Sequence, residues 1–115
     1  MAKGAGVVTR VKSGILVSAA LRHASSAMID CVLERRGDAD AGAIFVHIDA
    51  LDGRHQLLCR VLDFDGVYNW QPITKDVWTD AETVAARLAT EIKADPDIFV
   101  VAVADSSARN PFDGL

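Results

Sequence analysis

The spacing of hydrophobic residues changes from helical to alternating within the first third of the chain. From Ser13, a candidate N-cap, apolar residues recur three and four positions apart, which predicts an amphipathic helix. The β-branched Ile15 and Val17 leave a strand as the alternative for this segment. Residues 28–36 instead alternate between apolar and polar positions, a pattern typical of a half-buried strand.

Two further alternating runs, residues 43–50 and 55–64, flank a short turn sequence. Asp-Gly pairs favour two-residue type I′ turns, so we predict a hairpin that reverses at Asp52-Gly53. In the register that this turn sets, Val46 opposes Cys59, and the apolar residues of both strands share one face. A shift of one residue would move every side chain to the other face, so this register is a strong prediction.

The next segments predict a strand and a second helix. A second Asp-Gly pair at residues 65–66 leads into the sequence VYNWQ, which we interpret as a strand that ends at Pro72. Thr79 and Glu82 match a capping box. An apolar helical stripe follows them and stops at the Asp95-Pro96 pair.

Residues 98–104, IFVVAVA, are apolar on both faces, which places them inside a sheet or under a partner. The order of elements indicates the α+β class, with a mainly antiparallel meander sheet of four to five strands and two helices packed on one face. We expect a single domain over residues 1–115. Within it, residues 1–12 are expected to be a flexible arm, and residues 106–115 a polar tail that contains Asn110-Pro111-Phe112.

Length and charge narrow the possible functions. The 115 residues are 50% hydrophobic and 24% charged, which is typical of one folded domain. A net charge of −4 argues against a nucleic-acid partner, because phosphate contact needs clustered Lys and Arg. The charge is uneven: residues 1–36 hold six basic and two acidic side chains, and the remainder six basic and fourteen acidic. No signal peptide or membrane helix is visible, so we expect a cytoplasmic protein without a membrane partner.

A glycine-flanked acidic loop follows the first predicted strand. Asp38, Asp40 and Gly42 match the start of a calcium loop, but the twelfth position holds Asp49, in a predicted strand, where a bidentate Glu is required. Glycine allows positive φ, and aspartate bonds its own backbone in turns. We therefore interpret the loop as a tight connection in which Gly37 and Gly42 supply the conformational freedom.

The side chains that usually carry catalysis do not converge in the predicted structure. His47 and His55 point to opposite faces of the hairpin, where they can neither share a metal ion nor form a proton relay. Cys31 and Cys59 face the predicted core, where burial makes a thiol unreactive. We expect no catalytic residue, no metal site and no cofactor.

Two tryptophans are candidate contact residues. Trp70 and Trp78 flank a segment that contains Pro72, and exposed aromatic residues often mark interfaces. The alternative interpretation is that both tryptophans cover a small core.

Three segments carry a resemblance to a known family. The chain resembles the bacterial domain-of-unknown-function 1491 family, which has an early K-S-x-x-x-V-x-A-x-x-R segment, an R-R-G-D-x-D-A-G turn and a late D-P-D segment before a hydrophobic strand. In this chain they correspond to Lys12, Ser13, Val17, Ala19 and Arg22, then Arg35 through Gly42, then Asp95 through Val101. The family usually has tryptophan where this chain has Leu16 and Phe99. The resemblance implies a bacterial cytoplasmic domain and assigns no activity.

The sequence therefore predicts a non-enzymatic interaction or structural module that acts as a homodimer, with a further protein partner as a possibility. The alternative is a small hydrolase or ligand-binding enzyme that uses a corner formed by Arg35, Arg36, Asp38 and Asp40. A double-stranded RNA module is a third interpretation, but the second helix lacks the basic face it needs.

Overall fold

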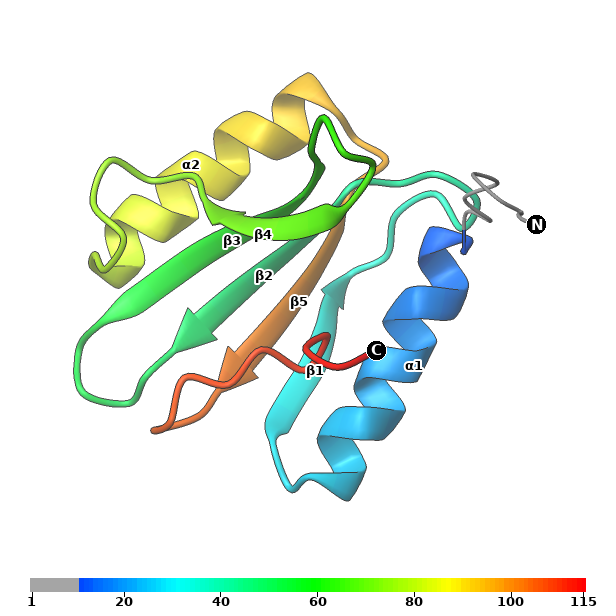
Figure 1. Ribbon diagram of the computed structural model, residues 1–115. Helices are drawn as coiled ribbons and strands as arrows, with labels where there is room; N and C mark the ends of the chain where they lie inside the picture. Colours follow the sequence, from blue (N-terminus) through cyan, green and yellow to red (C-terminus); the bar gives the residue numbers. More distant parts are fainter. Residues whose placement is uncertain (1–10) are drawn as a thin grey trace.

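The computed structural model describes residues 11–115 and shows two helices and five strands in this part of the chain (Figure 1). They are α1 (Ser13–Ser26), β1 (Asp30–Arg35), β2 (Ile44–Asp49), β3 (His55–Leu62), β4 (Tyr68–Pro72), α2 (Ala81–Ala94) and β5 (Phe99–Ala104). The expected α+β class is confirmed. The arm predicted for residues 1–12 lies outside the described residues, apart from Val11 and Lys12.

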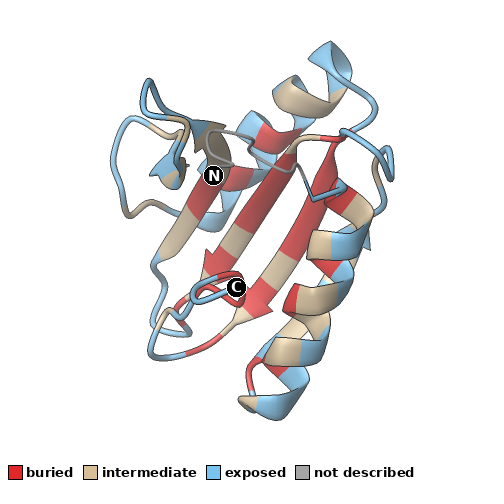
Figure 2. Ribbon diagram, turned by 45° about the vertical axis from the view of Figure 1, so that its right-hand side comes forward, coloured by how far each residue is buried: buried red, intermediate tan, exposed pale blue. Residues whose placement is uncertain are grey.

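The five strands form one sheet in the order β1-β5-β2-β3-β4. All neighbours are antiparallel except β2 and β5, which run parallel. The last strand thus inserts between β1 and β2, and buried residues run along the two central strands β2 and β5 (Figure 2). This placement confirms that the apolar segment 98–104 lies in the interior of a sheet, where β1 and β2 pair with its two edges.

The two helices lie on opposite faces of the sheet, so the prediction that both pack on one face is wrong. α1 packs on the face that carries Val46 and Val101, whereas α2 packs on the face that carries Phe45 and Val100. Both central strands bury successive residues, and two helices on one side would leave Phe45 and Val100 in water. One helix on each face removes both apolar surfaces from solvent.

The β2–β3 hairpin is shifted by one residue from the predicted register. Phe45 opposes Cys59, and the chain reverses through a longer loop closed by a hydrogen bond from Ala50 N to the Arg54 carbonyl oxygen. The Asp49 side chain accepts a hydrogen bond from Leu51 N at 2.8 Å, and Leu51 adopts a positive φ of 64°. The side chain and backbone of this loop therefore stabilise a wider turn than the Asp-Gly pair alone predicts.

The start of α2 also differs from the prediction. Asp80 caps the helix, because its Oδ1 accepts a hydrogen bond from Thr83 N at 2.7 Å. Thr79, the predicted cap, instead exchanges two backbone hydrogen bonds with His55 at the start of β3. The capping box is therefore absent, and Thr79 instead extends the pairing of the sheet.

The C-terminal segment 106–115 packs against the domain and is not only a polar tail. Phe112 is 5% exposed, and its ring centroid lies 4.8 Å from that of Trp70. His23 Nδ1 in α1 lies 2.8 Å from the Pro111 carbonyl oxygen. Because these contacts join the segment to α1 and to β4, it covers part of the sheet face beside α1.

Candidate functional site

The loop between β1 and β2 holds three segments of the chain together. Asp38 N donates a hydrogen bond to the Asp97 carbonyl oxygen at 2.9 Å, which joins the loop to the start of β5. The Ala39 carbonyl oxygen accepts a hydrogen bond from Gly14 N at 2.8 Å, which joins the loop to the first turn of α1. The loop therefore supplies the hydrogen-bond acceptor that the end of a helix lacks by itself.

The four charged side chains of this loop do not converge on a cleft. Arg35 Nη2 donates to the Pro96 carbonyl oxygen at 2.7 Å, and its Nε is buried without a partner. Asp38 Oδ2 accepts from the backbone of its own loop, and Asp40 forms an exposed ion pair with Lys12 at 3.5 Å. Arg36 is exposed. The contacts of these residues are those of a structural corner and give the hydrolase alternative no support.

The two loop glycines serve close packing, and the prediction that they adopt positive φ is wrong. Neither is among the residues with positive φ. A Cβ atom on Gly37 would lie 2.3 Å from the Asp97 carbonyl oxygen, and one on Gly42 would lie 2.5 Å from the same atom. The backbone of the loop approaches β5 so closely that only glycine fits.

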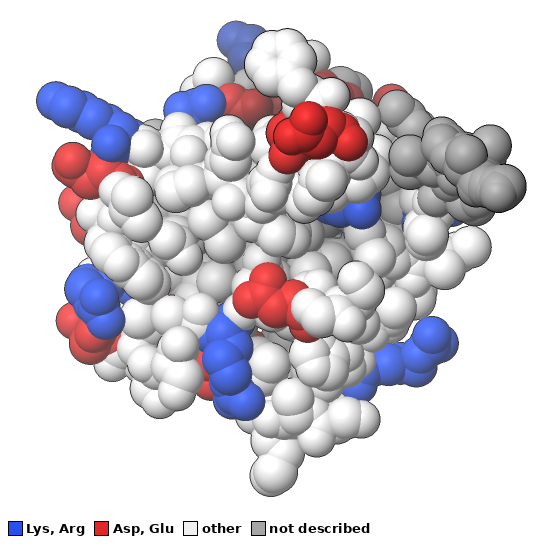
Figure 3. Space-filling view, in the orientation of Figure 1, with Lys and Arg blue, Asp and Glu red and all other residues white. Residues whose placement is uncertain are grey.

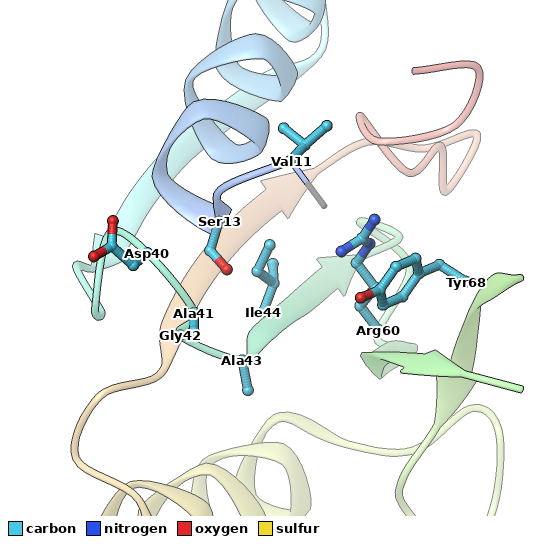
Figure 4. A pocket seen from close by; sticks show the side chains of 9 residues that line it. All are labelled: Val11, Ser13, Asp40, Ala41, Gly42, Ala43, Ile44, Arg60 and Tyr68. Carbon is cyan, nitrogen blue, oxygen red and sulfur yellow. The ribbon is translucent and has the colours of Figure 1, made fainter. Parts of the chain in front are cut away.

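A groove beside α1 begins at this corner, where Asp40 lines it, and extends to the C-terminal segment. It consists of two adjoining hollows of about 180 and 220 Å³ that share Arg60 of β3 and Tyr68 of β4. The first lies between the α1 N-terminus and the hairpin (Figure 4). Trp70 and Phe112 line the second. We call the two hollows together the Arg60 groove.

Arg60 carries a positive charge in a setting that combines aromatic and polar side chains. Its guanidinium lies 3.6 Å from the centroid of the Tyr68 ring, a cation–π contact. None of the ion pairs formed within residues 11–115 includes Arg60. Burial lowers the pKa of Arg60 from its usual value, yet arginine stays protonated at neutral pH. The groove therefore offers a cation that has no ion-pair partner within residues 11–115 and that lies against an aromatic ring.

On the side of the molecule that carries the C-terminal segment, acidic side chains lie above and below a hollow in which some basic atoms are recessed (Figure 3). Three exposed hydrophobic residues lie on the hairpin that carries Arg60, namely Leu62, Phe64 and Val67. The hairpin thus adds exposed apolar surface to the face that contains the groove.

The other side of the sheet carries a histidine pair that the sequence analysis excluded. Because the hairpin is shifted by one residue, His47 and His55 share a face, and His47 Nε2 lies 2.9 Å from His55 Nδ1. One of these nitrogens donates a hydrogen bond to the other. His55 Nε2 lies 3.9 Å from Asp49 Oδ1. His47 also lines a hollow of about 310 Å³, to which no residue of α2 contributes.

The histidine pair predicts a loss of stability in mild acid. Burial, followed by the neighbouring His55, lowers the pKa of His47, and the smaller effects of Glu34 and Asp49 oppose this. The unfolded chain therefore binds a proton at His47 more readily than the folded protein does. The free energy of unfolding should fall as the pH drops below about 6.5, the ordinary value for histidine.

Urea unfolding of the wild type and of His47→Gln between pH 7.5 and pH 5.5 measures this effect. We expect a shallower pH dependence in His47→Gln, which lacks the titrating group. Arg22→Gln, at an exposed position of α1, is the control, because it leaves the pair intact and should keep the wild-type dependence. Equal pH dependence in the wild type and His47→Gln would contradict the assignment.

Two of the six residues predicted to form a site contribute aromatic contacts. Trp70 lines the Arg60 groove, whereas Trp78 lies below Arg54, whose guanidinium carbon is 4.6 Å from the ring centroid. Sequence reasoning missed Arg60 and Tyr68. The signal that could have found Arg60 is its position as the only charged residue among apolar and aromatic neighbours on its face of the β3–β4 hairpin.

The cysteines and the carboxylates show no further convergence in the part of the chain that the structure describes. Cys31 packs on the α1 side and Cys59 on the α2 side, and burial raises the pKa of both thiols. Within residues 11–115, no three His, Cys, Asp or Glu side chains gather so that they could hold a metal ion. No helix in this range is long and apolar enough to cross a membrane.

Comparison with known proteins gives a family match and several similar solved structures. Residues 11–113 match the family described as Protein of unknown function (DUF1491). A crystal structure of a DUF1491 family protein from Caulobacter crescentus CB15 is 27% identical, with 89% of this chain and 94% of that chain covered and a TM-score of 0.80. An NMR structure of a DUF1491 family protein from the same organism is 28% identical, with 90% and 94% covered and a TM-score of 0.78.

A third similar structure is the solution structure of protein Atu0922 from A. tumefaciens, 29% identical, with 84% of this chain and 86% of that chain covered and a TM-score of 0.70. A comparison with curated proteins gives no match. The family match spans almost all of the described residues and includes the three segments that carried the resemblance. The resemblance is thereby confirmed, and the chain belongs to the DUF1491 family of proteins of unknown function.

Proposed function

We propose that the protein is a non-enzymatic interaction module that acts as a homodimer and uses the Arg60 groove as its contact surface. The observation that carries the proposal is the guanidinium of Arg60, which forms no ion pair within residues 11–115 and lies beside aromatic side chains. A partner that carries both a carboxylate and an apolar group would bind best here. Its carboxylate would form a charge-assisted hydrogen bond with Arg60, and its apolar group would leave water against the aromatic side chains.

The chemistry of the groove favours binding over catalysis. No histidine or cysteine is among the described residues that line either hollow. Ser13 and Tyr68 supply hydroxyl groups, but a serine nucleophile needs a base within hydrogen-bond reach, and none of the lining residues offers an imidazole. Arginine with tyrosine and tryptophan is instead the composition that dominates the energetics of protein interfaces.

Light scattering coupled to size-exclusion chromatography tests the proposal. We expect the wild type to shift with concentration from its monomer mass of 12.3 kDa to twice that value. Arg60→Glu should shift the equilibrium toward monomer, because the charge reversal repels a carboxylate. Arg22→Glu, an exposed arginine on α1, makes the same charge change and should dimerise like the wild type. A wild type that stays monomeric at high concentration would refute the homodimer.

A further inference from the structure

The turn between β3 and β4 presents a hydrophobic side chain to solvent and is held by side-chain hydrogen bonds. Asp63 Oδ1 accepts hydrogen bonds from Asp65 N and Val67 N, each at 2.9 Å, and its Oδ2 accepts one from Asn69 Nδ2. Gly66 adopts the positive φ of 78° that the turn needs. Phe64, between the two aspartates, is fully exposed.

The carboxylate beside Phe64 has no partner in the part of the chain that the structure describes. Asp65 contributes only its backbone N–H to the turn, and it forms no ion pair within residues 11–115. Asp63, in contrast, is fully engaged in holding the turn closed. The tip thus combines an aromatic ring with an unneutralised carboxylate. We call residues 63–66 the hairpin tip.

We infer that the hairpin tip of one copy occupies the Arg60 groove of a second copy. The Phe64 ring enters the hollow lined by Trp70 and Phe112, and the Asp65 carboxylate meets the Arg60 guanidinium. The inference rests on the proposed homodimer and names the segment that forms it. A hollow of about 220 Å³ has room for an aromatic ring, since benzene fits a cavity of about 150 Å³.

The hairpin tip and Arg60 lie on the same hairpin, so the contact between two copies can be reciprocal. Phe64 follows Arg60 by four residues, which corresponds to about 13 Å of extended chain at 3.3 Å per residue. A two-fold axis between two hairpins then places each tip at the groove of the other copy. Such an isologous contact closes at two copies, so the arrangement gives a dimer and not a filament.

Complementation between two variants tests the tip-in-groove contact. Phe64→Ser lacks the tip, and Arg60→Glu lacks the groove; each alone should dissociate at a concentration at least about tenfold higher than the wild type, as for loss of an interface anchor. An equimolar mixture should form a heterodimer, because the tip of the Arg60 variant meets the groove of the Phe64 variant. Val77→Ser, another exposed hydrophobic residue, is the matched control and should leave dimerisation unchanged.

A charge exchange tests the ionic part of the contact. Arg60→Asp and Asp65→Arg should each weaken dimerisation, and the double variant should recover it, because both reciprocal ion pairs are restored with reversed sign. The inference is overturned if the double variant dissociates as readily as the worse single variant. Circular dichroism of each variant confirms folding, and Phe64→Ser changes only an exposed side chain.

The outcomes separate the inference from the proposed function. If the wild type dimerises and Phe64→Ser dimerises equally well, the tip is not the contact, and the inference is overturned while the homodimer stands. If the wild type remains monomeric, both are overturned. A tenfold loss in Phe64→Ser together with heterodimer formation in the mixture supports both.

Discussion

Gly42→Ala is expected to lower the free energy of unfolding by about 3 kcal/mol, at the upper end of the usual effect of overpacking. The added Cβ would lie 2.5 Å from the Asp97 carbonyl oxygen and 2.7 Å from the Asp38 carbonyl oxygen. Both neighbours are backbone atoms, which cannot rotate aside as a side chain can. Relief therefore requires the loop to separate from β5, with loss of the hydrogen bond between Asp38 N and Asp97.

Urea denaturation of Gly42→Ala and Gly53→Ala measures this effect against a control of the same chemistry. An added Cβ on Gly53 would meet no atom within 4 Å, but Gly53 has a φ of 89°. Alanine there is expected to cost only about 1 kcal/mol, the conformational penalty of a positive φ. A Gly42→Ala variant as stable as Gly53→Ala would show that the loop can move away from β5 at little cost.

Two of the segments that carry the family resemblance lie far apart in the sequence but pack against each other at this corner. The R-R-G-D-x-D-A-G turn and the D-P-D segment meet where Asp38 N bonds to Asp97 and where Gly37 and Gly42 approach the same carbonyl oxygen. Sequence analysis identified the loop as a structural connection. It assigned the glycines to positive φ, because a local pattern contains no information on a strand that arrives sixty residues later.

The elements of the fold could be predicted from the sequence, but the two faces of the sheet could not. Strands β2 and β5 each bury several residues in succession, and Ile44, Phe45 and Val46 are all buried. The predicted register rested on the agreement between the apolar pattern and the Asp-Gly pair, but an apolar run of this kind also fits a register shifted by one residue. The one-residue error concealed the contact between His47 and His55.

The Arg60 groove could be predicted only in part, because it is built from segments that are distant in sequence. The sequence identified Trp70 as a candidate contact residue because it flanks a segment that contains Pro72. Arg60 is a candidate contact residue because no carboxylate within residues 11–115 forms an ion pair with it. That property follows from the packing of the C-terminal segment and α1 around the hairpin, which no local pattern shows.

Phe112→Ala is expected to lower the free energy of unfolding by about 3 to 4 kcal/mol, because it removes a buried aromatic ring. Phe112 belongs to the core on the α1 side and packs against Trp70. It also lines the groove, so the same substitution should weaken self-association. Thermal and urea unfolding give the first effect, and light scattering below the unfolding transition gives the second.

Phe112→Leu separates the contribution of packing from that of ring shape. Leucine keeps most of the apolar volume, so we expect this variant to lose less than about 1.5 kcal/mol. If residues 106–115 were only a polar tail, Phe112→Ala would change stability by less than about 0.5 kcal/mol, as for an ordinary surface substitution. A large loss in Phe112→Ala and a small one in Phe112→Leu would instead show that the C-terminal segment forms part of the core and one wall of the groove.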